Sequence, residues 1–373
     1  MIPLNVGDNK AVSLLDSLVN VSGTTFFSSN TEVVSVASGT ITAVAPGVAV
    51  LYATNPADGT VKSVNIIVLS ASDLLANNSH DYKIDLTVIV VPPGTVLGTY
   101  TVGSEPFNLA IDGSGYAWVA NQITNNVTKL SSTGSVIGTY AVGTGPFDIA
   151  INGSGNVWVT NSGDNTVTEL SSTGSVIGTY AVGTQPYGIA IDSGSNSWIV
   201  NYDSNNVTKL SSTGSVIGTY AVGSFPRGIA IDLISGHVWT TSWDSASVVQ
   251  LSSAGAKLGT YTVGTEPWGL AVDGSGNVWV ANFGSDNVTK LSSTGSLVGT
   301  YAVGTNPVDI AIDSTGNIWI TNETSNNVTE LSSTGVTIGT YTVGSTPQGI
   351  AIDGAGNAWV ANSGNSSISK LSS

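Results

Sequence analysis

Cysteine is absent from this 373-residue chain, and charged residues make up only 9% of it. Without cysteine there can be no disulfide and no thiolate metal site, although the absence does not identify a compartment. Basic residues are the scarcer charge: nine Lys and Arg stand against 24 Asp and Glu, for a net charge of −15. Such a chain repels nucleic acid and anionic lipid, so we expect no nucleic-acid partner.

Long apolar runs are also missing. The first residues, MIPLNVGDNKAVSLL, lack the basic start and the apolar stretch of a secretory signal. No segment approaches the ~20 consecutive apolar residues that span a bilayer. We therefore expect neither a signal peptide nor membrane insertion.

The chain is rich in glycine, with 45 residues, and it repeats itself. A proline follows each of seven Val-Gly pairs, and a tryptophan follows each proline at a nearly constant distance. The prolines are Pro106, Pro146, Pro186, Pro226, Pro267, Pro307 and Pro347. The tryptophans are Trp118, Trp158, Trp198, Trp239, Trp279, Trp319 and Trp359. A period of about 40 residues with strand-like content predicts the blades of a β-propeller.

Each repeat contains four short segments that favour strands. In one copy they are GIAID (188–192), SNSWIVN (195–201), NVTKLSS (206–212) and SVIGTYAVG (215–223). Each is rich in β-branched or aromatic residues and is bounded by Gly, Asn, Asp or Ser. The fourth segments carry a single charge, Lys257, although exposed edge strands are normally guarded by charge. We interpret the few charges as a sign that neighbouring copies cover the outer rim, which the fourth strands form, in an assembly.

The two ends of the array indicate how the ring closes. The array opens with a fourth-strand sequence, TVLGTYTVG (95–103), and finishes with a third-strand sequence, SISKLSS (367–373). The first of these is therefore expected to complete the last blade. The predicted fold is all-β: an N-terminal immunoglobulin-like β-sandwich followed by a seven-bladed β-propeller with 3+1 strand closure.

The propeller resembles two groups of known families through the motifs PxGIAID, GNVWVTN and NVTKLSSTG. It is similar to propellers of the NHL and YVTN type, and its repeat pattern is similar to that of the streptogramin lyase family. This resemblance implies the fold over residues 93–373. The lyases use a catalytic histidine, a nearby glutamate and a magnesium ion. This propeller has one histidine, His237.

The N-terminal part resembles a bacterial immunoglobulin-like domain of the group 2 type. The resemblance rests on LNVGD (4–8) and SSNTEVVSVASGTITAVAPG (28–47), and it covers residues 1–70. Short alternating strands separated by turns agree with a sandwich. Residues 71–92 are predicted to be a linker with an extra strand, and residues 93–373 the propeller.

The loops predict where a ligand would bind. Because successive strands alternate in direction, the fourth-to-first and second-to-third loops share one face, and these are the loops that vary between repeats. Variable loops on a rigid scaffold are typical of binding sites, although drift in exposed loops is the alternative. Their aromatic, amide and acidic side chains favour a sugar-like ligand. The candidates are Phe107, Asn108, Phe147, Asp148, Tyr187, Phe225, Arg227, Trp243, Trp268, Phe283 and Asp309.

The other chemistry-bearing residues are given structural roles. His237 is expected on the face opposite Arg227. The Asp residues that precede Gly/Ser turns, such as Asp112, are expected to accept hydrogen bonds from their own turns rather than to bind calcium. The third strands carry Lys, Glu or Gln at one position, and this alternation suggests ion pairs between neighbouring blades. Because seven blades cannot alternate completely around a ring, Lys370 is expected to lie unpaired beside Lys129.

We expect a non-enzymatic structural and binding protein that is displayed on a virion. In this hypothesis the immunoglobulin-like domain attaches the protein, and the propeller faces surface glycans within a homo-oligomeric assembly. A cell-surface adhesin or S-layer-type protein is an alternative, and a propeller enzyme of the lyase or lactonase type is a second alternative. No cofactor or metal is expected in the main hypothesis.

Overall fold

The computed structural model describes residues 25–28, 34–37, 40–43, 47–54, 61–68 and 92–372. The chain divides into two compact units, Met1–Pro92 and Pro93–Ser373. Among the described residues of the first unit, five strands form a three-stranded sheet in the order β1-β4-β5 and a two-stranded sheet, β2-β3. They are β1 (Thr25–Ser28), β2 (Val34–Ala37), β3 (Thr40–Ala43), β4 (Gly47–Thr54) and β5 (Val61–Val68). The immunoglobulin-like sandwich stays a prediction, because much of residues 1–70 lies outside the described residues, as does the predicted linker up to residue 91.

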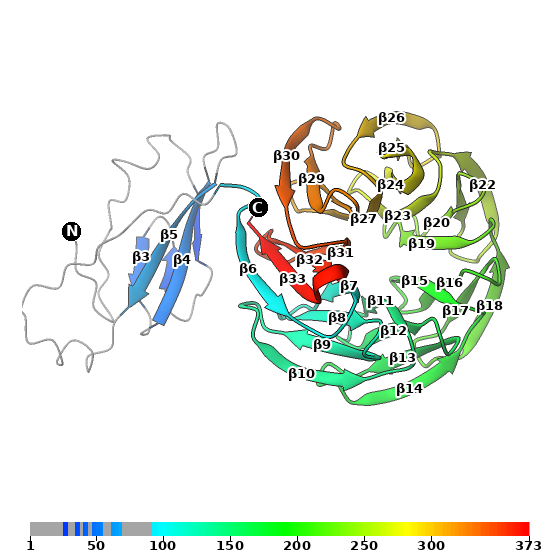
Figure 1. The fold of residues 1–373 in the computed structure, drawn as a ribbon, viewed down its shortest axis with the longest axis horizontal. Helices are drawn as coiled ribbons and strands as arrows, with labels where there is room; N and C mark the ends of the chain where they lie inside the picture. The colour runs from blue at the N-terminus through cyan, green and yellow to red at the C-terminus, as the bar shows by residue number, and fades with distance from the viewer. Residues whose placement is uncertain are drawn as a thin grey trace, which may run out of the picture. The chain divides into compact units, whose positions relative to one another are not determined.

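The second unit is a ring of seven four-stranded antiparallel sheets, which confirms the seven-bladed propeller (Figure 1). The first strands, each beginning at one of the repeated prolines, are β7 (Pro106–Ile111), β11 (Pro146–Ile151), β15 (Pro186–Ile191), β19 (Pro226–Ile231), β23 (Pro267–Val272), β27 (Pro307–Ile312) and β31 (Pro347–Ile352). The second strands are β8 (Ala117–Asn121), β12 (Val157–Asn161), β16 (Ser197–Asn201), β20 (Val238–Ser242), β24 (Val278–Asn282), β28 (Ile318–Asn322) and β32 (Ala358–Asn362). Blades are numbered 1 to 7 in the order of these strands.

The outer half of each blade follows the same order. The third strands are β9 (Asn126–Leu130), β13 (Thr166–Leu170), β17 (Asn206–Leu210), β21 (Ser247–Leu251), β25 (Asn287–Leu291), β29 (Asn327–Leu331) and β33 (Ser367–Leu371). The fourth strands are β10 (Val136–Ala141), β14 (Val176–Ala181), β18 (Val216–Ala221), β22 (Lys257–Thr262), β26 (Leu297–Ala302), β30 (Thr337–Thr342) and, for blade 7, β6 (Val96–Thr101). Two single 3-10 turns, η1 (Phe283–Ser285) and η2 (Ser363–Asn365), lie in second-to-third loops.

Strand β6 closes the ring as the sequence predicts. It pairs antiparallel with β33, so blade 7 is built from both ends of the propeller. Gly94 N donates to Ser372 O (2.8 Å) and Ser372 N donates to Thr95 O (2.9 Å). Two equivalent hydrogen bonds close the third-to-fourth turn of blade 1, where the chain is unbroken: Gly134 N donates to Ser131 O, and Ser131 N donates to Ser135 O. The two ends therefore rebuild a normal blade turn without a covalent link.

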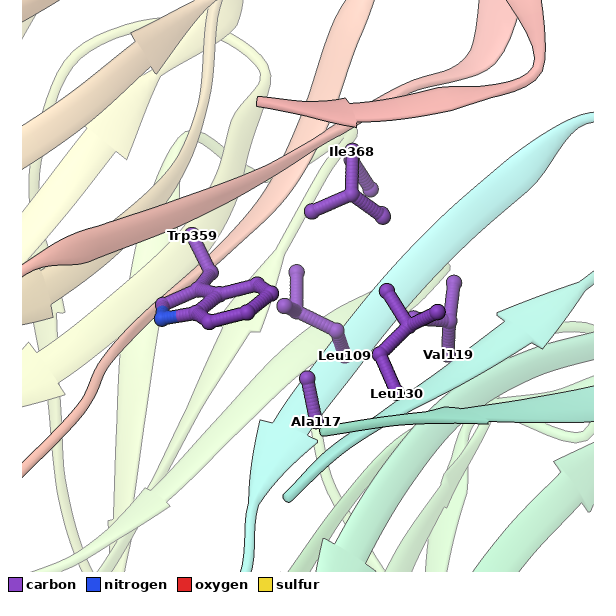
Figure 2. Close-up of a cluster of buried hydrophobic side chains, with 7 residues drawn as sticks. Leu109, Ala117, Val119, Leu130, Trp359 and Ile368 are labelled. Atoms are coloured by element: carbon purple, nitrogen blue, oxygen red, sulfur yellow. The ribbon is translucent and has the colours of Figure 1, made fainter. Parts of the chain in front are cut away.

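The hydrophobic core lies between blades rather than within them. The tryptophan of each second strand is buried against the first three strands of the next blade. At the closing seam, Trp359 and Ile368 of blade 7 pack on Leu109, Val119 and Leu130 of blade 1 (Figure 2). Because each cluster needs two neighbouring blades, no blade buries its apolar surface alone, and the closed ring is the stable unit.

The outermost strands of the ring carry β-bulges rather than charges as protection against pairing with strands of other molecules. In each blade the fourth strand shifts register against the third, as between Val136 and Gly138. Such bulges are one of the devices that block edge-to-edge strand pairing. The missing charge at the rim does not therefore require a covering partner, and the predicted homo-oligomer stays a prediction.

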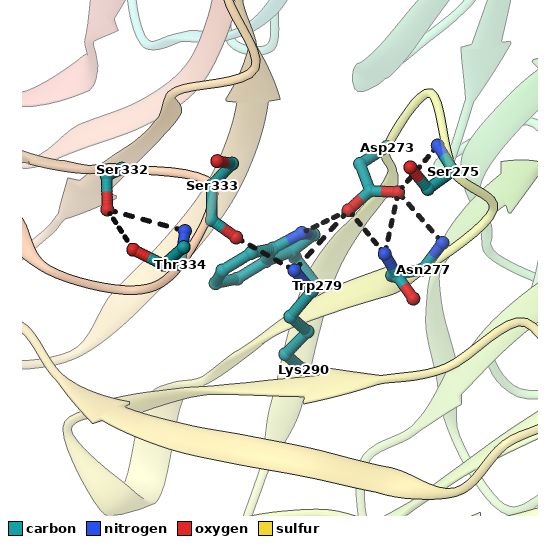
Figure 3. Close-up of polar contacts among 8 residues, drawn as sticks. All are labelled: Asp273, Ser275, Asn277, Trp279, Lys290, Ser332, Ser333 and Thr334. Carbon is teal, nitrogen blue, oxygen red and sulfur yellow. Dashed lines mark hydrogen bonds and ion pairs between the residues drawn. The ribbon is translucent and has the colours of Figure 1, made fainter.

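Lysines on the third strands form their ion pairs within their own blade, so the predicted ion pairs between blades are wrong. Each lysine reaches the next blade by a hydrogen bond to a backbone carbonyl. Lys290 Nζ lies 3.7 Å from Asp273 Oδ2, and it donates to Ser333 O of blade 6 (2.8 Å) (Figure 3). Lys370 likewise pairs with Asp353 (2.9 Å) and donates to Ser132 O of blade 1, so it does not lie unpaired beside another lysine. A lysine can reach both partners because the aspartate of its own first-to-second turn lies directly beside it.

Aspartates at the first-to-second turns organise those turns, as predicted. Asp112 Oδ1 accepts hydrogen bonds from Ser114 N (2.9 Å) and Tyr116 N (3.0 Å), and its Oδ2 accepts one from Trp118 Nε1 (3.0 Å). The carboxylate thus fixes its own turn and the buried indole together.

Glycines in the third-to-fourth turns give a direct test of the packing between blades. Gly174 has φ +89°, and a Cβ there would overlap the ring of Tyr140 from the preceding blade. Gly174→Ala is expected to destabilise the protein by about 2–4 kcal/mol, because it combines left-handed strain with a steric overlap. Urea unfolding measures the change.

The control for this substitution is Gly153→Ala. Gly153 lies in the first-to-second turn of blade 2, and no atom lies within 4 Å of the position that a Cβ would take. We expect a change within about 0.5 kcal/mol there. Equal losses at Gly174 and Gly153 would contradict the packing role of the tyrosines.

Candidate functional site

The two sets of variable loops meet on one face, as the alternation of strand direction predicts. Backbone bonds join them within each blade: Gln122 N donates to Glu105 O (2.9 Å), and Ser162 N donates to Gly145 O (2.9 Å). Further bonds join neighbouring blades, as from Gln185 N to Asn165 Oδ1 (2.8 Å). The face is therefore a rigid, cross-linked platform.

The residues that precede the repeated prolines adopt a strained conformation on this face. Glu105, Gln185, Phe225, Glu266, Asn306 and Thr346 all have φ between 47° and 54°, and blade 2 has Gly145 with φ 62°. Left-handed backbone is costly for residues other than glycine. Strain of this kind is commonly held where a structure must aim particular side chains.

A small cavity opens on the same face, where the first strands converge at the propeller axis. Its volume is about 60 Å³, which is room for a few water molecules or one small functional group. Seven of the predicted site residues line it: Phe107, Asn108, Phe147, Asp148, Arg227, Trp268 and Asp309. We call this cavity the axial pocket.

The innermost ring of the axial pocket combines three polar residues with four glycines. The glycines, which the sequence analysis did not single out, are Gly188, Gly228, Gly269 and Gly349. A Cβ at Gly188 would lie 2.6 Å from Arg227 O, and one at Gly269 would lie 2.5 Å from Val308 O. Glycine is needed at these positions because the backbone of the next blade is too close. The repeated Pro-x-Gly pattern in the sequence was the available signal.

Asp148 is held at the axis by three N–H groups. Its Oδ1 accepts hydrogen bonds from Ile149 N (2.8 Å) and Asn108 Nδ2 (2.6 Å), and its Oδ2 accepts one from Ile189 N of blade 3 (2.8 Å). Burial raises the pKa of Asp148 to about 7; the charge of Asp309 adds to the rise, and the N–H donors oppose it. Asp148 can therefore exchange a proton near neutral pH.

Asp309 occupies the same position in blade 6 with fewer partners. Its Oδ2 accepts a hydrogen bond from Ile350 N of blade 7 (3.2 Å). Burial raises the pKa of Asp309 to about 6, opposed by the backbone N–H groups of Ile310 and Ile350. The two carboxyls thus form an interacting pair at the axis.

Arg227, the only arginine of the chain, is held against aromatic rings beside the axis. Its guanidinium carbon lies 4.0 Å from the ring centre of Trp243 and 4.1 Å from that of Trp268. The ring centres of Tyr202 and Tyr187 lie 5.0 and 5.6 Å away. These contacts are cation–π contacts, which fix the position of the charge. Burial lowers the pKa of Arg227, but an arginine stays protonated in proteins.

The remaining predicted aromatics extend the platform around Arg227. Phe147 stacks on Tyr187, with ring centres 4.0 Å apart, and it contacts the tilted ring of Phe107 at 3.9 Å. Phe283 contacts Trp243 and Trp268 at 5.5 and 5.2 Å. Phe225 contacts Tyr202 at 4.9 Å, and Tyr202 is a residue that the sequence analysis missed. Ten of the eleven predicted residues therefore line the axial pocket or contact its lining, and Phe225 is connected to it through Tyr202, which lies against Arg227.

His237 lies away from this site, in the first-to-second turn of blade 4. Its Nδ1 is 3.0 Å from Gln250 Nε2, and Gln250 also donates to Ser293 O in a third-to-fourth turn. Turns of these two kinds form the opposite face of the ring, so the predicted separation of His237 from Arg227 is confirmed.

The propeller sequence matches a known protein family over almost its whole length. Residues 97–371 match the model of the virginiamycin B lyase family. The chain belongs to the virginiamycin B lyase family. The match spans the propeller from the closing strand β6 to the end of β33, so all seven blades are included.

Solved structures agree with this fold. A streptogramin B lyase structure is 21% identical, with a TM-score of 0.68, over 74% of this chain and 96% of that one. A catalytically inactive histidine-to-alanine variant of virginiamycin B lyase from Staphylococcus aureus, with quinupristin, is 18% identical, with a TM-score of 0.67, over 74% and 99%. Hydrazine synthase from Kuenenia stuttgartiensis is 17% identical, with a TM-score of 0.68, over 75% and 99%. A search of curated proteins finds no significant match.

These findings correct the sequence-based expectation of function. The family membership contradicts a virion structural protein, and it contradicts the prediction that the chain is not an enzyme. The viral, adhesion and carbohydrate-binding expectations have no support. The sparse charge of the rim does not indicate an assembly, because the fourth strands carry bulges, and the family match supports the lyase resemblance instead.

The magnesium ion that the family implies does not fit these residues. Among the residues that the structure describes, no three His, Asp or Glu side chains are grouped to hold a metal ion. The Asp148 oxygens already accept three N–H groups, and the Arg227 guanidinium lines the same cavity. A cation would find few free lone pairs on this carboxylate and would lie beside a fixed positive charge.

Proposed function

We propose that this protein is a propeller enzyme of the lyase or lactonase type whose active site is the axial pocket. The observation that carries the proposal is the axial pocket itself, where one carboxyl that titrates near neutrality and one fixed arginine face the same cavity. Membership of the virginiamycin B lyase family supports the reaction class. The aromatic platform supplies the binding surface that surrounds the reacting group.

Asp148 is the proposed general base. A base works best when its pKa lies near the working pH, because it is then both ionised and strong enough to accept the proton. In the elimination, Asp148 removes a proton from a carbon next to a carbonyl group. The electron pair of that C–H bond forms a carbon–carbon double bond, while the bond from the adjacent carbon to an ester oxygen breaks. The proton remains on Asp148 until solvent removes it.

Arg227 is the proposed partner of the leaving group. Cleavage of the carbon–oxygen bond releases a carboxylate, and a fixed guanidinium stabilises the negative charge as it develops. The cation–π contacts hold Arg227 in place before substrate binds, so little reorganisation is needed.

The size of the axial pocket sets what a substrate must look like. About 60 Å³ admits one functional group and not a whole macrocycle. The rest of the substrate would lie across the aromatic rings of Phe107, Phe147, Tyr187 and Trp268. An apolar ligand with an ester that can be presented at its edge fits this arrangement.

Quinupristin, the compound present with one of the similar structures, is the probe for the test. The full-length protein is incubated with it, and the products are analysed by liquid chromatography and mass spectrometry. Elimination opens a cyclic ester without changing its mass, whereas hydrolysis adds the mass of one water. A linear product of unchanged mass supports the proposal. A hydrated product would replace the base step with attack by water, and an unconsumed compound with no binding would count against this substrate class.

A further inference from the structure

We propose that Asn108 is a positioning residue, which aims the Asp148 carboxylate and tunes its proton affinity. This inference rests on the proposed function of Asp148 as the base. Asn108 Nδ2 donates to Asp148 Oδ1 at 2.6 Å, across the boundary between blades 1 and 2. Its own Oδ1 accepts a hydrogen bond from Leu109 N (2.8 Å), so the orientation of the amide is fixed.

The seven-fold repeat contains its own comparison for this contact. Asp309 occupies the same register as Asp148, but the residue that precedes it around the ring is Gly269, which has no side chain to donate. Both carboxylates accept a backbone N–H from the following blade, Ile189 for Asp148 and Ile350 for Asp309. The amide of Asn108 is therefore a hydrogen-bond donor that Asp148 has and Asp309 lacks.

Space for Asn108 is provided by the blade before it. A Cβ at Gly349 would collide with Asn108 Oδ1, so the asparagine depends on a glycine in blade 7. A chain of contacts thus runs around the axis: Gly349 leaves room for Asn108, Asn108 donates to Asp148, and Asp148 accepts the N–H of Ile189. Four blades therefore cooperate to place one carboxylate.

The charges around Asp148 determine how its titration responds to Asn108. The titratable and charged groups on the surrounding strands are Tyr187 on β15, Arg227 on β19 and Asp309 on β27. A hydrogen bond from an amide favours the ionised form of a carboxyl and lowers its pKa. Loss of the Asn108 donor should raise the proton affinity of Asp148, while these other groups stay in place.

The experiment uses two full-length variants, Asn108→Gly and Asn108→Leu. Glycine occupies the equivalent position in four blades, so the backbone accepts it; leucine keeps most of the volume without a donor. Carbon NMR of protein labelled at the aspartate carboxyls follows the titration, and the Asp148 signal is assigned by its loss in Asp148→Asn. The turnover of quinupristin is measured against pH on the same samples.

We expect the Asp148 midpoint to rise by about one pH unit in both variants, which is a tenfold loss of ionised base below the midpoint. The acid limb of turnover should move by the same amount. An unchanged Asp148 midpoint, with only a lower melting temperature, would overturn the inference and leave Asn108 a structural residue. If the wild-type protein is inactive on quinupristin, the proposed function fails on that substrate, while the NMR titration still decides the role of Asn108.

Discussion

A chain that begins at Val102, and so lacks β6, is expected to lose the cooperative unfolding transition of the propeller. Blade 7 would then have three strands, and the ladder between β6 and β33 would be lost. That ladder and the stacking of Tyr100 on Trp359 (5.7 Å) stabilise the seam by an amount on the order of 5 kcal/mol or more, at about 1 kcal/mol per hydrogen bond plus the buried ring. A loss of this size is comparable to the whole stability of a typical domain.

Two matched chains isolate the contribution of β6. A chain that begins at Pro93 keeps β6 and removes only the first unit, so its melting transition should match that of the propeller in the full-length protein. A second chain begins at Val102 and carries a third-to-fourth turn and a copy of β6 after Ser373, and it should recover the transition. Circular dichroism during heating measures all of them. Equal melting of the chains beginning at Val102 and Pro93 would show that the seam does not hold the ring.

Asp148→Asn is expected to lower the turnover of quinupristin by a factor of about 10²–10⁴, the usual contribution of a general base. The substitution keeps the size of the side chain and removes its ability to accept a proton from substrate. Steady-state kinetics should show the loss in kcat, with a smaller change in KM, because the aromatic platform is untouched.

His237→Gln is the control for this prediction. His237 lies on the face opposite the axial pocket, where it contacts Gln250. Turnover should therefore stay within about twofold of wild type. A large loss of turnover in His237→Gln, with normal turnover in Asp148→Asn, would show that the active site lies on the opposite face of the ring.

The architecture could be predicted because the repeat itself carries the information. The spacing of residues such as Pro106 and Trp118 sets the blade length, and the unmatched strand sequences at 95–103 and 367–373 predict the closure. The face of the site followed from strand direction. These features depend on order along the chain, which the sequence displays directly.

The chemistry of the axial pocket could not be predicted in the same way. Asp148 and Asp309 are among the predicted candidates, but burial at the axis raises the pKa of both, and the charge of Asp309 adds to the rise for Asp148. The contact between Asn108 and Asp148 joins residues 40 positions apart, and it depends on how each blade leans on the next. The lysine partners were mispredicted for a related reason, because the turn aspartates lie closer than any neighbouring blade's acid.

The dependence of turnover on pH tests most directly the claim that a carboxyl at the axis is the base. The ionised form of Asp148 is the active one, so kcat/KM should rise with pH through an apparent pKa of about 7 and then level off. Removal of the neighbouring negative charge in Asp309→Asn should lower the pKa of Asp148 and shift this rise to lower pH. A profile that rises near pH 7 and moves to lower pH in Asp309→Asn would support the account. A profile that Asp309→Asn leaves in place, but that His237→Gln moves or abolishes, would contradict it.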